Sequence, residues 1–150
     1  MPASHQGMNW IRPEKRLAIY IRDRFTCAYC HTDLSRARPG RKGQHGDLTL
    51  DHLVAREHGG TNEPRNLVTC CMDCNRAKSS TPVDTFVSGP EHLFAIWASA
   101  AEPLNLPLAR AILASAPKWH AARRAAVRRL KPALLDSPPR AAVLRTETAP

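Results

Sequence analysis

The sequence predicts an α+β fold in which a small ββα core follows an N-terminal helix and precedes a helical C-terminal extension. Three observations support this class. Two short apolar segments, 48–54 and 67–69, suit strands, and a polar helical segment begins just after the second. Apolar residues recur at helical spacing well before the first strand. After Pro82 the composition changes to Ala and Leu between spaced prolines, which indicates short helices.

The N-terminal helix is predicted from about Pro13 to Asp23, after residues 1–11, which are expected to be disordered. Proline suits the first turn of a helix, and Leu17 and Ile21 lie one turn apart on one face. The helix carries basic side chains that either form a solvated face or contact phosphate: Arg12, Lys15, Arg16, Arg22 and Arg24.

The core is predicted to contain a strand, a loop, a second strand and a helix. Before it, residues 35–47 hold basic residues and glycines, which is typical of a flexible basic loop. The first strand, over 48–54, places two leucines on one face, and Gly59 and Gly60 predict a turn. The helix that begins at Met72 or Asp73 carries three polar residues of interest: Asn75, Arg76 and Lys78.

The extension is predicted to contain three or four short helices, at about 82–87, 91–101, 107–114 and 117–130. Trp97 and Trp119 are expected in the core, and His92 at the surface. The last helix is strongly basic, so it either extends a binding surface or packs on the core. The chain thus divides into a disordered N-terminus (1–11), a core domain (12–82), a helical extension (83–135) and a disordered tail (136–150).

Four of the five cysteines form two C-x-x-C pairs, Cys27 with Cys30 and Cys71 with Cys74. Four thiolates can close a tetrahedral zinc site, and such a site is structural because it leaves no open position for water. Cys70 could replace Cys71 through a C-x3-C spacing, but a buried apolar role on the second strand is favoured. A redox role for the pairs is a weaker hypothesis than metal binding.

The chain is basic, with 22 Lys and Arg against 13 Asp and Glu and a net charge of +9. This balance favours a polyanionic partner, nucleic acid first and an anionic membrane surface second, although a basic protein can also lack such a partner. No apolar run approaches the length of a membrane helix, and no signal peptide opens the chain, so a cytoplasmic location without a membrane is expected. The oligomeric state is not indicated.

Asp51, His52 and Asn75 are the candidate catalytic residues, since Asp51 and His52 lie between the cysteine pairs and Asn75 directly follows Cys74. A carboxylate, an imidazole and an amide oxygen are the groups needed to hold a divalent cation and activate a water molecule. Taken singly, an Asp-His pair is most often a surface or capping pair, and Asn75 could cap the helix.

Five segments, in order, resemble the zinc-bearing HNH endonuclease family of ββα-metal nucleases. They are Cys27-x2-Cys30, Leu50–Val54, Gly59-Gly60, Asn66–Val68 and Cys71-x2-Cys74-Asn75-Arg76-x-Lys78. The resemblance covers roughly Arg12 to Pro82. It implies that His52 is the general base, that Asp51 is the acidic metal ligand and that Asn75 completes the ligand set. It also implies that Asn66 braces the loop and helps to orient the histidine.

The resemblance implies a metal-dependent endonuclease that hydrolyses DNA phosphodiester bonds. Its cofactors would be a structural Zn2+ on Cys27, Cys30, Cys71 and Cys74, and a catalytic Mg2+ or other divalent cation on Asp51 and Asn75. Adjacent strand residues point to opposite faces, so both Asp51 and His52 reach one cation only if the strand ends at His52. The alternative is a non-catalytic, zinc-stabilised nucleic-acid-binding module. The expected DNA contacts are Arg76, Lys78, Arg124, Arg128 and Lys131.

Overall fold

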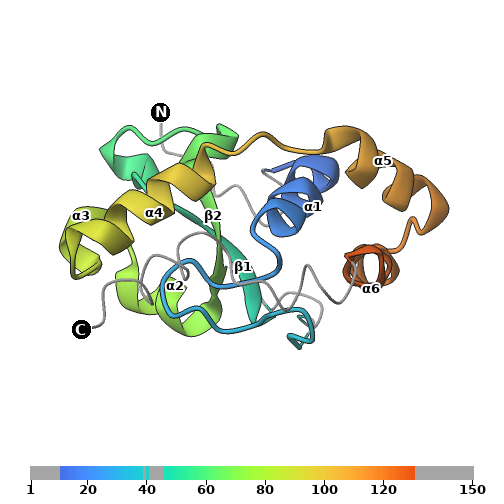
Figure 1. Ribbon diagram of the computed structural model, residues 1–150, viewed down its shortest axis with the longest axis horizontal. Coiled ribbons are helices and arrows are strands. Elements are labelled where there is room, and N and C mark those ends of the chain that lie inside the picture. The colour runs from blue at the N-terminus through green and yellow to red at the C-terminus, as the bar shows by residue number, and fades with distance from the viewer. Residues whose placement is uncertain (1–10, 39, 41–45, 131–150) are drawn as a thin grey trace.

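A computed structural model describes residues 11–38, 40 and 46–130 of the protein. The elements are arranged around one short antiparallel hairpin (Figure 1). In chain order they are α1 (Pro13–Arg22), β1 (Leu48–His52), η1 (Arg56–His58), η2 (Pro64–Asn66), β2 (Leu67–Cys71), α2 (Met72–Lys78), α3 (Val83–Phe86), α4 (Pro90–Ala100), α5 (Leu106–Ser115) and α6 (Trp119–Arg129). The predicted α+β class is confirmed.

The hairpin pairs Leu48 with Cys71 at one end and His52 with Leu67 at the other. The strand β1 ends at His52, and α2 begins directly after β2, so the hairpin and this helix form the ββα unit. Both faces of β2 are covered, because Leu67 packs into one apolar cluster and Val68 into another. The hairpin therefore lies in the middle of the molecule.

The first apolar cluster joins α1 to the C-terminal helices. In Figure 1, α1 lies between the hairpin and the pair α5 and α6. The small side chains Ala122 and Ala126, one turn apart on α6, are buried, which lets this helix pack closely. Trp119 packs beside Tyr20, with 6.3 Å between the ring centroids, so its predicted place in the core is confirmed.

The second cluster lies on the other face of the hairpin and includes residues of α3 and α4. Here two expectations are wrong. Trp97 is 38% exposed, because it lies on the outer side of α4 with Phe94. His92 is buried instead, and its Nε2 lies 3.0 Å from the carbonyl oxygen of Ala28. Within the described ranges, no helix combines the length and the hydrophobicity needed to cross a bilayer.

A buried ion pair connects α1 to three other parts of the fold. The Arg22 side chain is 3% exposed and lies 2.7 Å from the Asp23 carboxylate, which corrects its assignment to a solvated or phosphate-binding face. The Arg22 guanidinium also donates to the carbonyl oxygens of three distant residues, Pro64, Leu67 and Ala100. Since every charge here has a partner, the pair holds α1, η2, β2 and α4 in one arrangement.

Candidate active site and metal centre

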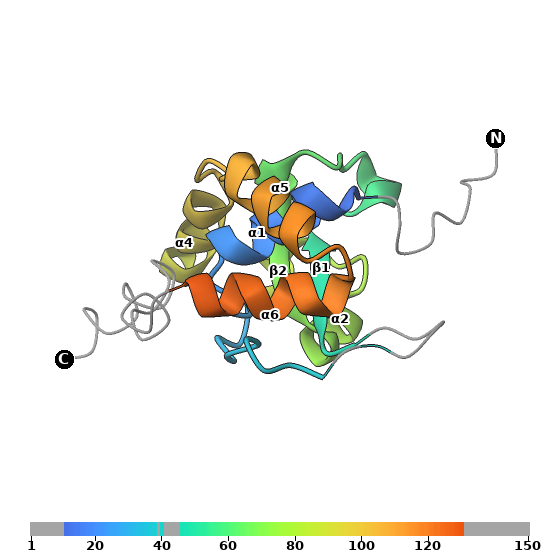
Figure 2. The ribbon, with the colours of Figure 1, turned by 90° about the vertical axis from the view of Figure 1, so that its right-hand side faces the viewer.

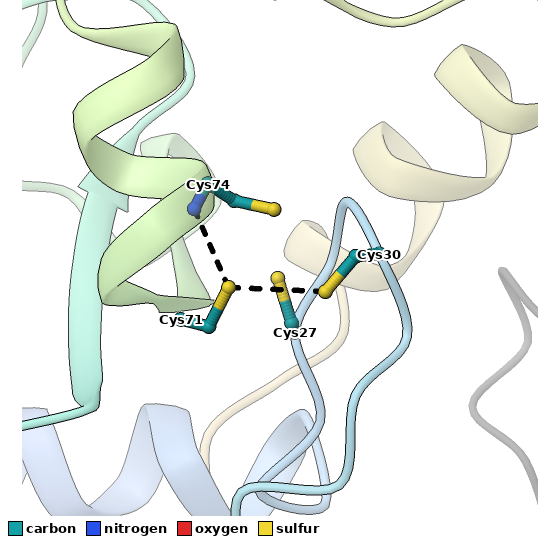
Figure 3. Close-up of side chains that lie close together, drawn as sticks. All are labelled: Cys27, Cys30, Cys71 and Cys74. Carbon is teal, nitrogen blue, oxygen red and sulfur yellow. Dashed lines mark hydrogen bonds between the residues drawn. The ribbon is translucent and has the colours of Figure 1, made fainter.

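The four cysteines of the two C-x-x-C pairs converge from three segments. Cys27 and Cys30 lie on the turn after α1, Cys71 ends β2, and Cys74 lies on α2. Their sulfur atoms all lie within 4.8 Å of one another, turned toward a common centre (Figure 3). Tetrahedral zinc with Zn–S bonds of about 2.3 Å spaces its sulfurs by about 3.8 Å. The Cys30 and Cys71 sulfurs lie 3.8 Å apart, so these cysteines are positioned to bind a metal ion.

Backbone hydrogen bonds shape this cysteine turn. The amide of Cys27 donates to the Thr32 carbonyl and the amide of His31 to the Cys27 carbonyl, each at 3.0 Å. The Ala28 amide donates to Thr69 at 2.9 Å, which attaches the turn to β2. Two segments far apart in sequence are thus held together at the metal centre.

The fifth cysteine, Cys70, lies outside the four-sulfur cluster. Its side chain is fully buried, and its thiol donates to the Cys71 carbonyl oxygen at 3.1 Å. Its contact with Cys27, together with burial, raises the pKa of Cys70, so it remains a neutral thiol. Burial is the main cause that raises the pKa values of Cys71 and Cys74, and the nearby Cys27 charge adds to it.

Asp51 lies near the end of β1, where a buried network holds its carboxylate. The Tyr29 hydroxyl donates to Asp51 Oδ2 at 2.6 Å, and the Lys78 ammonium lies 3.1 Å from the same oxygen. Lys78 also donates to the His52 carbonyl oxygen at 2.9 Å. Asp51 is 6% exposed and Lys78 is fully buried. Asp51 and Lys78 therefore form a buried ion pair beside the end of β1.

The ring of His52 is oriented by Asn62. The His52 Nε2 lies 3.0 Å from Asn62 Oδ1, which can only accept, so Nε2 carries the proton and Nδ1 keeps its lone pair. The Asn62 backbone carbonyl accepts from Lys15 of α1 at 3.1 Å, and Arg56 donates to the same Oδ1 at 3.0 Å. Burial is the main cause that lowers the pKa of His52, which keeps the ring neutral near pH 7.

Asn66 braces the loop that carries Asn62. Its Oδ1 accepts from the Val54 amide at 2.9 Å, and its Nδ2 donates to the carbonyls of Val54 and Thr61 at 3.0 and 2.9 Å. A Cβ atom at Gly60 would lie 1.7 Å from the Val54 carbonyl oxygen, so the loop needs glycine there. Asn66 is therefore connected to His52 through the loop and Asn62.

Asn75 packs against β1 from the first turns of α2. Its Nδ2 donates to Thr49 Oγ1 at 2.9 Å and to the Leu50 carbonyl at 3.2 Å. With both amide hydrogens bound to the strand, the planar amide turns its Oδ1 away from those two acceptors. An amide oxygen and a carboxylate form the hard donor set that suits Mg2+, so Asn75 and Asp51 fit this cation by their chemistry.

Comparison with known proteins bears on this arrangement. A family model described as HNH endonuclease matches residues 27–81. Residues 27–81 form an HNH endonuclease domain. A CRISPR-associated endonuclease Cas9 of Actinomyces naeslundii is 38% identical over 73 residues, which make up 48% of this chain and 5% of that protein. No solved structure matches the chain. The two matches support a nuclease-type function for the HNH domain.

The structure brings the four cysteines of the HNH domain together and places Asp51, His52, Asn66 and Asn75 around the end of β1. The predicted phosphate contact at Lys78 is wrong, because this side chain is fully buried against Asp51. Of the other expected DNA contacts, Arg76, Arg124 and Arg128 are exposed, while Lys131 lies outside the described residues.

Sequence reasoning missed two residues of the HNH domain, Tyr29 and Asn62. Tyr29 lies inside the first C-x-x-C pair, where a hydroxyl-bearing aromatic residue can reach from the metal centre toward the strand. Asn62 lies in the loop that follows Gly59 and Gly60, where a side-chain amide beside a candidate base is a suitable orienting group. The roles of these two residues can be recognised only when it is known which segments of the chain lie next to each other in the fold.

Proposed function

We propose that the HNH domain hydrolyses phosphodiester bonds of DNA, with His52 as the general base. The observation that carries this proposal is the hydrogen bond between His52 Nε2 and Asn62 Oδ1, 3.0 Å long. It leaves Nδ1 as the basic nitrogen of the neutral ring, and the lowered pKa of His52 keeps the ring neutral near pH 7. In this role, Nδ1 takes the proton of the water that attacks phosphorus.

We further propose that Asp51 and Asn75 hold the catalytic divalent cation, Mg2+ or a related ion. Asp51 Oδ2 is engaged by Tyr29 and Lys78, so Oδ1 is the oxygen assigned to the cation. Asn75 offers Oδ1 because its Nδ2 is held by β1. When bound, the cation would stabilise negative charge on the phosphate and the leaving oxygen.

The metal at the four cysteines is proposed to be Zn2+ in a structural role. Four soft sulfur ligands suit zinc, and a complete set of protein ligands leaves no position for a reacting water. Asn66 is assigned a positioning role, since its hydrogen bonds go to backbone atoms of the loop.

The alternative function is a non-catalytic, zinc-stabilised nucleic-acid-binding module. One observation favours it, because the 3.1 Å ion pair with Lys78 compensates the Asp51 charge that a cation would otherwise meet. A binding module, however, needs no oriented neutral histidine at the end of the strand. We therefore favour catalysis, because it explains the oriented neutral histidine and a binding module does not.

The test compares His52→Ala with His58→Ala, which removes an exposed histidine of η1 from the same domain. Nicking of supercoiled plasmid by the zinc-loaded full chain is measured with Mg2+ present. His52→Ala should lower the cleavage rate by roughly two to four orders of magnitude. His58→Ala should cleave like the wild type, and both variants should retain zinc and DNA affinity. Cleavage by His52→Ala at nearly the wild-type rate would remove His52 from the mechanism.

A further inference from the structure

A basic groove lies between α6 and the segment 35–37. It has a volume of about 390 Å³. Figure 2 shows α6 across this side of the molecule, with the blue segment that contains residues 35–37 below it. All the charged or titratable side chains described along the groove are basic: Arg36, His120, Arg123, Arg124 and Arg128. The α6 wall lies outside the matched HNH segment.

The packing of α6 fixes which side chains face this groove. Ala122 and Ala126 bury one side of the helix against the core, so Arg124 and Arg128, also one turn apart, remain exposed on another side. The Arg123 guanidinium donates to the Ala37 carbonyl oxygen, which attaches the segment 35–37 to the helix. The two walls of the groove are therefore joined.

Among the described residues, the lining of the groove holds positive charge and no acidic side chain. Burial is the main cause that lowers the pKa of Arg123, and the charge of Arg124 adds to it. Like charges held this close raise the free energy of the unliganded protein, and a bound anion relieves that cost. Guanidinium groups form paired hydrogen bonds with phosphate oxygens, so phosphate is the anion that this lining suits best.

We propose that this groove binds the phosphate backbone of the DNA substrate, as a second contact apart from the catalytic residues. This inference rests on the proposed function. Arginines along an exposed helix face suit a linear polyanion, and the net charge of +9 agrees with such a partner. An anionic membrane is disfavoured, because the apolar side of α6 is already packed on the core and offers nothing to insert into lipid.

The test measures binding of a short duplex by the full chain at several salt concentrations, in a His52→Ala background that prevents cleavage. The variant Arg124→Ala/Arg128→Ala removes two charges from the groove. The control Arg110→Ala/Arg129→Ala removes two exposed arginines that do not line it. The groove variant should lower the slope of log affinity against log salt by about 2, at ~0.9 per phosphate contact, while the control keeps the wild-type slope.

An equal decrease of the salt slope in both variants would show that only net charge matters, and it would contradict the groove proposal. An unchanged salt slope in both variants would also contradict the groove proposal. Vesicles of phosphatidylserine form a second arm, and binding that depends on Arg124 and Arg128 for vesicles but not for the duplex would assign the groove to a membrane. Plasmid nicking is scored separately in the wild-type background. If duplex binding does not depend on Arg124 and Arg128 but the wild type nicks plasmid, the groove proposal fails and the proposed function stands. If binding depends on these arginines but the wild type does not nick plasmid, the groove remains a DNA contact and the proposed function fails.

Discussion

The Tyr29 hydroxyl connects the metal centre to the candidate active site. Tyr29 lies between Cys27 and Cys30, and its ring packs edge-on against Phe86 with 5.3 Å between centroids. Burial and the Asp51 charge raise the pKa of Tyr29, so the hydroxyl stays protonated and donates to Asp51 at 2.6 Å. A change at the cysteine turn should therefore reach the carboxylate that we assign to the catalytic cation.

Tyr29→Phe tests this connection because it keeps the ring and removes the donor. The variant should retain zinc, lose about 1.5–3 kcal/mol in the free energy of unfolding, and need more Mn2+ for half-maximal nicking, since Asp51 is less firmly held. Tyr20→Phe is the matched control, because this buried hydroxyl accepts a hydrogen bond from Arg16, which lies outside the candidate site. A Mn2+ requirement that rises equally in both variants, or in neither, would contradict the connection.

The lowered pKa of His52 predicts the pH dependence of cleavage. The ring must be neutral to accept a proton, so the single-turnover rate should rise with pH and level off above a midpoint below about 6.5. The hydrogen bond that His52 Nε2 donates to Asn62 Oδ1 opposes this lowering, so Asn62→Ala should move the midpoint further down and reduce the plateau. A wild-type midpoint above 6.5 would rule out a buried His52 as the base.

The same shift has a consequence for stability. A lowered pKa in the folded protein means that folding favours the neutral ring of His52. The contribution of this ring to the free energy of unfolding is therefore fully present above about pH 6.5. It is lost as the pH falls through the folded pKa. Chemical unfolding of wild type and His52→Gln across this range should show a pH-dependent difference below 6.5.

At the scale of elements, the Arg22–Asp23 pair connects α1 to η2, β2 and α4. Arg22→Met should cost about 3–5 kcal/mol in the free energy of unfolding, because the 8% exposed Asp23 side chain loses its ion-pair partner. Arg12→Met removes the same charge from an exposed position beside the same helix and should cost little. Urea unfolding measures both. A similar small loss in the two variants would show that the pair does not hold the fold.

Local patterns were sufficient to predict most elements. The predicted helix from Pro13 to Asp23 corresponds to α1, and the one over 91–101 corresponds to α4, because apolar spacing and proline breaks act within a few residues. The burial of Lys78 could not be predicted in this way. It depends on Asp51 and the His52 carbonyl, which reach Lys78 only after the hairpin and α2 have packed. Exposed Trp97 and buried His92 depend on tertiary packing in the same way.

In the candidate site, too, local sequence predicts some residues, and others depend on tertiary packing. The cysteines and the residues Asp51, His52 and Asn75 could be selected from spacing and residue type, because a metal site restricts both. The residues that orient them, Tyr29 and Asn62, act through contacts between distant segments. Spacing along the chain carries little information about such contacts.

At the scale of the whole molecule, the proposed zinc joins the turn after α1 to β2 and α2. Strong chelation should remove it and unfold the domain, because the free energy of metal binding contributes to folding in small sites. Omitting only Mg2+ should stop cleavage and leave the circular dichroism spectrum unchanged. Cys71→Ser should lower zinc content and thermal stability much more than Cys70→Ser. A folded, purified sample without bound metal would contradict the structural role.

The C-terminal helices matter for both stability and charge. Because α5 and α6 pack on α1, a truncation before α6 would expose the first apolar cluster and remove the basic groove together. The surface substitutions at Arg124 and Arg128 separate these two effects. The proposed division of the chain near residue 82 therefore does not make the extension a detachable part.

The central claim is that this chain cleaves DNA and does more than bind it. The most direct measurement incubates the zinc-loaded wild-type protein with supercoiled plasmid, with and without Mg2+, and follows both nicked product and retardation on a gel. We expect nicked product only with the divalent cation, and none from His52→Ala at the same degree of retardation. Retardation without nicked product in Mg2+ or Mn2+ would contradict the claim and identify a non-catalytic binding module.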